Sequence, residues 1–97
     1  MSYVDEVAEA IRARVATGRL PNADTATLFR LYAVLALAKG EAVTLQDVHD
    51  AWAAWMSDRD PEHASLRPFD ELSAEVQDAD APYRDAIHAV ARERGLG

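Results

Sequence analysis

The feature that most constrains the fold is the apolar run "LFRLYAVLALA" at residues 28–38. Its large side chains occupy nearly every side of a helical period of 3.6 residues, with Arg30 as the exception. A helix that is apolar all round is normally packed by neighbours on all sides. We therefore predict that a helix capped by Asp24 or Thr25 and ended by Gly40 lies at the centre of an all-α protein.

Two further helices begin with the pattern of a capping box, in which an N-cap hydroxyl is followed three residues later by an acidic side chain. Ser2 with Asp5 predicts the start of the first helix, and Gly18 predicts its end. Thr44 with Asp47 predicts the start of a helix after the central one. The predicted buried stripes are Val4, Val7, Ala8, Ile11 and Val15 in the first of these helices, and Leu45, Val48, Trp52, Trp55 and Met56 in the second.

The C-terminal part of the chain is predicted as a folded loop followed by one more helix. Residues 57–68 contain two prolines and many polar side chains, which favours a loop, and residues 68–77 suggest one or two short helical turns. Asp80 is the expected N-cap of the last helix, with Pro82 in its first turn. The expected buried stripe of that helix is Tyr83, Ile87, Val90 and Ala91. The prediction is a single helical domain over residues 1–97: a small bundle of three main helices plus a C-terminal helix joined through a folded loop.

Composition excludes several functions. The formal net charge is −7, and the arginines are spread from Arg12 to Arg94, so they form no basic patch along the chain. Such a chain is repelled by nucleic acid and by anionic membranes. The absence of cysteine excludes disulfides, thiolate nucleophiles and cysteine zinc sites. Because the N-terminus lacks a signal-peptide pattern and the longest apolar run is too short to span a membrane, we expect a cytoplasmic protein.

Residues 35–52 have the sequence pattern of a helix-turn-helix, with "TLQDVHDAW" at the position of the recognition helix. A recognition helix needs Arg, Lys, Asn or Gln facing the DNA. The residues expected to point outward are Gln46, Asp47 and Asp50, and two carboxylates have the wrong sign for a phosphate backbone. We expect no nucleic-acid binding here, and a helix-turn-helix-like regulator remains a secondary alternative.

Metal and catalytic motifs are absent from the sequence. His49, His63 and His88 have no ligand spacing on a shared helix face, and no HExxH occurs, so each is expected to be a surface or loop-anchoring imidazole. There is no glycine-rich phosphate loop and no nucleophile elbow. We predict that the protein is not an enzyme and needs neither a metal nor another cofactor.

Residues 48–72 hold both tryptophans, two of the three histidines and a Pro-Phe pair. A small domain needs large buried side chains, so we predict that Trp52 belongs to the core. For Trp55, the sequence does not decide between a place in the core and a role as an exposed anchor for a partner protein. The candidate partner-binding residues are Trp55, Pro68, Phe69, His49 and His63.

The segments at 31–56 and 63–87 carry an ordered pattern: an apolar helix ending in Lys-Gly, then Val-His-x-Ala-Trp, a His, Pro-Phe-x-Glu-Leu and Asp-x-x-Tyr-x-x-x-Ile. In this pattern the chain resembles a family of small uncharacterised proteins of actinobacteriophages and actinobacterial prophages. Residues 48–87 are also similar to the ryanodine-receptor repeat module, in the order of a helical Val-His-x-x-Trp segment, a Pro-aromatic turn and a further helix. The first resemblance implies a phage-type origin and no particular activity.

Two function classes follow from these observations. The leading hypothesis is a phage-type accessory protein that binds a host or phage protein in the host cytoplasm. The alternative is an acidic mimic of nucleic acid that inhibits a DNA-handling enzyme, which would need carboxylates spaced along one face. The acidic residues are instead scattered along the chain, with clusters only at residues 78–80 and around residues 58–62. Whether the chain forms a homo-oligomer is left open.

Overall fold

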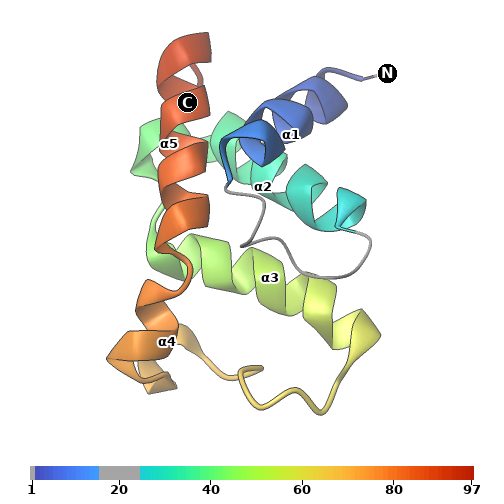
Figure 1. Ribbon diagram of the computed structural model, residues 1–97, viewed down its shortest axis with the longest axis vertical. Coiled ribbons are helices and arrows are strands. Elements are labelled where there is room, and N and C mark those ends of the chain that lie inside the picture. Colours follow the sequence, from blue (N-terminus) through green and yellow to red (C-terminus); the bar gives the residue numbers. More distant parts are fainter. Residues whose placement is uncertain (1, 16–24) are drawn as a thin grey trace.

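The computed structural model describes residues 2–15 and 25–97, and within these ranges every regular element is a helix (Figure 1). The elements are α1 (Tyr3–Arg14), α2 (Ala26–Lys39), η2 (Gly40–Ala42), α3 (Leu45–Arg59), η3 (Phe69–Glu71), α4 (Ala74–Asp78) and α5 (Ala81–Arg94). The all-α prediction is therefore confirmed. The predicted helix end at Gly18 and the predicted cap at Asp24 lie outside the described residues.

Helix α2 contacts α1, α3 and α5, as predicted for the central helix. Its apolar residues are not covered on every side, however. Val34 is 52% exposed, on the same strip as exposed Arg30 and Ala38. These residues are spaced by four and share one helical face, which no helix of the described ranges covers. Arg30 pairs with Asp5 of α1 across 3.3 Å at one end of this strip.

Both predicted capping boxes are present. The Ser2 hydroxyl accepts from the backbone N–H of Asp5, and Thr44 does the same with Asp47. The hydrogen bonds from Ser2 lower the pKa of Asp5. Burial acts to raise the pKa of Asp47, but hydrogen bonds from Thr44 and from Lys39, whose Nζ lies 3.1 Å away, outweigh it and lower that pKa. Each cap therefore fixes where its helix begins and also stabilises the charged form of its aspartate.

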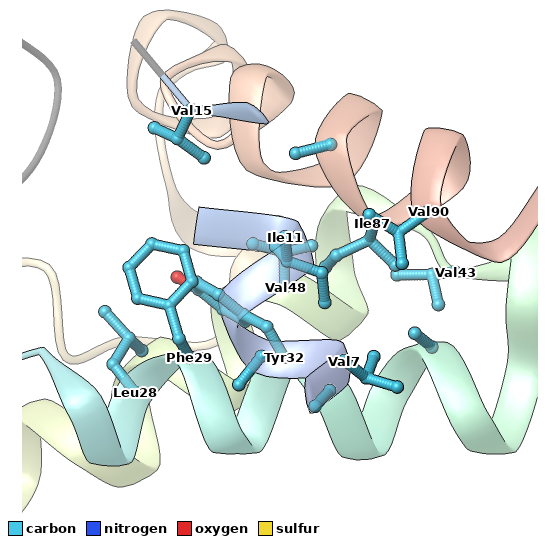
Figure 2. Packing of buried hydrophobic residues seen from close by; sticks show 14 of the residues in the cluster. Val7, Ile11, Val15, Leu28, Phe29, Tyr32, Val43, Val48, Ile87 and Val90 are labelled. Atoms are coloured by element: carbon cyan, nitrogen blue, oxygen red, sulfur yellow. The ribbon is translucent and has the colours of Figure 1, made fainter. Parts of the chain in front are cut away.

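Side chains from α1, α2, α3 and α5 converge in a single core (Figure 2). Ile11, Phe29, Tyr32, Val48 and Ile87 are essentially inaccessible to solvent. The rings of Phe29 and Tyr32 meet edge to face with centroids 5.4 Å apart, a favoured arrangement for aromatic pairs. The core thus contains a large share of aromatic area for so small a domain.

The C-terminal half follows the prediction with two changes. Helix α3 extends to Arg59, so the loop is shorter than predicted and covers residues 60–68. The short helical turns predicted at 68–77 are present as η3 and α4. Asp80 occupies the N-cap position of α5, but its side chain makes no capping hydrogen bond.

His88 was expected to be a surface or loop-anchoring imidazole, and it anchors the turn that precedes α3. Its ring is half-buried, and Nε2–H donates to the backbone carbonyl of Val43 at 2.6 Å. The bond ties α5 to the turn between α2 and α3. A buried carbonyl that lies outside regular helical hydrogen bonding needs such a donor.

The turn after α2 depends on Gly40, where φ is 58° and ψ is −127°. Residues with a Cβ rarely adopt this backbone conformation. A Cβ on Gly40 would also overlap the carbonyl oxygen of Leu96, because the C-terminal residues pack directly on this turn. Gly95 ends α5 with φ 65°, but open space surrounds its Cα.

We predict that Gly40→Ala lowers the free energy of unfolding by at least about 3 kcal/mol, since it adds backbone strain and a clash with the C-terminal segment. Gly95→Ala adds only the cost of a left-handed residue and should lower it by about 1 kcal/mol. Urea unfolding of both variants measures the difference. Equal losses would show that the close packing at Gly40 contributes nothing.

Candidate functional site

A pocket of about 280 Å³ opens between α2, α3, α4 and α5. Its described walls are mainly apolar and aromatic, with few polar groups. The pocket is lined by Tyr32 from α2, His49 and Trp52 from α3, Val76 from α4, and Asp80 and Tyr83 at the start of α5, among others. Elements far apart in the sequence therefore build one concave surface.

The α3 wall is fixed by His49, which is only 3% exposed. Its Nε2–H donates to the backbone carbonyl of Arg67 at 2.7 Å, so the prediction of a loop-anchoring imidazole is confirmed for this residue. The ring also stacks on Trp52, with centroids 5.6 Å apart and planes 28° apart. This histidine therefore holds the 60–68 loop and one indole at the same time.

The loop returns to the same indole through His63. The His63 ring meets Trp52 edge to face with centroids 5.0 Å apart, and its Nδ1 accepts from the backbone N–H of Ser65 at 3.0 Å. That hydrogen bond fixes the orientation of the imidazole within the loop. Trp52 thus lies between two histidines that come from different parts of the chain.

The opposite wall is made by two tyrosines. The rings of Tyr32 and Tyr83 lie with centroids 5.7 Å apart and planes tilted by 41°. Burial raises the pKa of Tyr32, and the nearby Asp80 carboxylate raises it further. The phenol of Tyr32 therefore stays protonated and polar at the junction between the core and the pocket.

Asp80 places a carboxyl group among these rings. Burial raises its pKa, and the nearby His49 acts in the opposite direction but does not cancel the effect. Within residues 2–15 and 25–97, no lysine or arginine forms an ion pair with Asp80. A half-buried carboxylate without a cationic partner is unfavourable for the folded protein.

The structure shows how deeply each of the two tryptophans is buried. Trp52 was predicted to be core; it packs against the core but is only half-buried, and it also lines the pocket. Trp55, left open between core and anchor, is 5% exposed and belongs to the core. The Arg59 guanidinium covers its ring at 4.3 Å, and among residues 2–15 and 25–97 its Nε1–H has no hydrogen-bond partner. The helical period puts both indoles on one broad face, and only the packing of neighbouring elements distinguishes them.

The structure brings three of the predicted partner-binding residues together. Phe69 is half-buried with its ring 6.1 Å from that of His49, and His63 reaches the same cluster through Trp52. Gln77 of α4 donates to the Phe69 carbonyl at 2.8 Å and so fixes η3. Pro68 is exposed beside this cluster, whereas Trp55 lies apart from it.

Sequence reasoning missed Tyr32, Val76, Asp80 and Tyr83 as site residues. Tyr83 was assigned to the core, and Asp80 to helix capping alone. The unused capping position is visible only in the structure, because a sequence cannot show that an N-cap side chain makes no hydrogen bond to its helix. No sequence signal joins Tyr32 to residues some fifty positions later in the chain.

Three other features bear on function: a metal site, a membrane-spanning helix and a basic surface on α3. In the described part of the chain, no three histidine, aspartate or glutamate side chains are grouped closely enough to hold a metal ion. No helix among these residues is both long and apolar enough to cross a membrane. The exposed residues of α3 include Gln46 and Asp50, and Asp47 beside them is paired with Lys39, so this surface is acidic or neutral.

Fold and pocket together define a small all-α domain with a preformed aromatic pocket and one internal carboxyl group. Residues 2–92 match the model of the domain of unknown function DUF7701, and the chain belongs to this family. A search of the curated proteins and a search of the solved structures found no match.

We predict that Trp55→Ala lowers the free energy of unfolding by about 3–5 kcal/mol, because it leaves a cavity in the core. Trp52→Ala should cost clearly less, since its indole is already partly in contact with water. Chemical denaturation followed by far-UV circular dichroism compares the two. A larger loss for Trp52→Ala would contradict the assignment of the two indoles.

Asp80→Asn should make the protein more stable near neutral pH. Because the folded state raises the pKa of Asp80 above its ordinary 3.8, the wild type loses stability as the pH rises through that range and up to the folded pKa. The advantage of the variant should therefore be full at about pH 7 and vanish at about pH 3, where the carboxyl is protonated in both states. Asp78→Asn, at an exposed position of α4, is the control and should follow the wild type. Thermal unfolding between about pH 3 and pH 7 tests this prediction. A stability difference between Asp80→Asn and the wild type that grows towards acidic pH would contradict the raised pKa of Asp80.

Proposed function

We propose that this protein is a non-enzymatic binding module that takes a side chain of a partner protein into the pocket between α2, α3, α4 and α5. The observation that carries the proposal is the preformed aromatic pocket itself. Hydrogen bonds and ring contacts already hold its walls at His49, Trp52 and His63. A rigid pocket loses little conformational freedom when it is filled.

The size of the pocket favours a protein side chain over a larger ligand. Sites for small molecules commonly have volumes of about 300–1,000 Å³, and this pocket lies at the lower end with about 280 Å³. Val76 on the α4 side of the pocket is 39% exposed and extends the apolar surface outward. An anchor residue in the pocket with apolar contacts around it is the usual arrangement at the centre of a protein interface.

The charge pattern supports this proposal over an acidic mimic of nucleic acid. Several carboxylates are paired with basic groups on the protein itself, including Asp5 with Arg30, Asp47 with Lys39 and Glu41 with Arg92. These pairs lie on different elements and do not form one acidic row. Internal pairing also reduces the negative charge that a mimic would present.

The setting proposed for this interaction is the cytoplasm of an actinobacterial host, with a host or phage protein as the partner. This part rests on the sequence pattern that resembles actinobacteriophage proteins, including Val48–His49 and Asp80 with Tyr83. A binding protein without catalytic groups suits a small accessory role.

The test is affinity capture from an actinobacterial lysate with matched surface variants. Val76→Arg should place a charged side chain at the pocket mouth and abolish recovery of the specific partner. Val34→Arg introduces the same change on the exposed strip of α2 and should leave recovery unchanged. Circular dichroism must show that both variants are folded. Recovery of the partner that survives Val76→Arg would place the interface elsewhere and overturn the proposal, whatever the result with Val34→Arg.

A further inference from the structure

We infer that the side chain received by this pocket is a methylated lysine, whose alkylated ammonium group lies among the aromatic rings beside Asp80. This inference rests on the proposed function and specifies its ligand. It follows from the half-buried carboxyl group of Asp80, which forms no ion pair with a lysine or arginine of the described residues, and from the aromatic and apolar composition of the walls.

The carboxyl group of Asp80 defines the charge of the ligand. It lines the pocket and is half-buried, and no lysine or arginine in the described ranges forms an ion pair with it. The Asp80 side chain also makes no capping hydrogen bond to the N-terminus of α5. His49 favours the ionised form of Asp80 but does not offset the effect of burial. A permanent cation in the pocket would stabilise the carboxylate further, whereas an anion or a neutral apolar group would not.

The walls of the pocket favour a cation with an apolar surface. Trp52, Tyr32, Tyr83 and the His49 ring all line the same hollow. Aromatic rings attract cations through their quadrupole, and this attraction increases when water is excluded. Such rings also make good apolar contacts with methyl groups.

The apolar character of the walls favours a methylated ammonium over a free one. An unmodified lysine carries three N–H donors, each of which needs an acceptor when it leaves water. The side-chain oxygens in the walls come from Asp80, Tyr32, Tyr83 and Ser65, and the remaining side chains are mainly apolar or aromatic. Methylation removes donors and adds apolar surface while the positive charge remains, so it fits these walls better.

The experiment uses the full chain and three minimal ligands: Nα-acetyl-trimethyllysine methylamide, the same compound with unmodified lysine, and its neutral isostere with a tert-butyl group in place of the trimethylammonium group. Titrations are followed by amide and indole NMR signals. The trimethylated ligand should shift the signals of Trp52 and Tyr83 and bind about tenfold more tightly than either of the others. Asp80→Asn should lower its affinity by about tenfold and leave the isostere unaffected, and Asp78→Asn should behave as the wild type.

Each outcome decides between the two proposals. If the isostere binds in the pocket as tightly as the cation, or Asp80→Asn has no effect, the methylated-lysine inference is overturned and the pocket remains an apolar docking site. If no ligand shifts the pocket signals at tens of millimolar, the inference fails as well. The proposed function fails separately, through partner capture that survives Val76→Arg.

Discussion

Burial of the aromatic side chains on α2 is the interaction on which the rest of the structure depends. Phe29 and Tyr32 are almost inaccessible to solvent and meet side chains from α1, α3 and α5 (Figure 2). Buried aromatic area of this kind contributes a large share of the stability of a domain with a small core. Tyr32 also reaches the aromatic pocket, so the same residue belongs to the core and to the candidate site.

Two histidines connect the irregular segments to this helical frame. His88 donates to the Val43 carbonyl, and His49 donates to the Arg67 carbonyl. Both segments carry backbone carbonyls that regular helical hydrogen bonding does not satisfy, and a buried imidazole N–H meets that need. The crowding of rare side chains at residues 48–72 is explained in part by this role, because His49, Trp52 and His63 together hold a loop with little apolar area of its own.

The pocket combines features that oppose each other energetically. The rings of Trp52 and Tyr83 create an apolar surface, and Asp80 places a carboxyl group within it. Burial makes the charged form of that carboxyl less favourable, as its raised pKa reflects. Groups that are unfavourable in the free protein and close to a pocket are typical of binding sites, since a ligand of opposite charge relieves the cost. The proposals of a binding module and of a cationic ligand both follow from this combination.

Sequence alone determined the helical class, the start of α1 and α3, and the central place of α2, because capping boxes and apolar periodicity are local patterns. It also placed the short turns before α5. Only the tertiary structure decided that Trp55 is core and Trp52 lines a pocket, since their shared helical face does not show which neighbour covers which indole. The sequence also could not predict that Tyr32, His49 and Asp80 line one pocket, because this depends on the packing of α2, α3 and α5 across long separations in the chain.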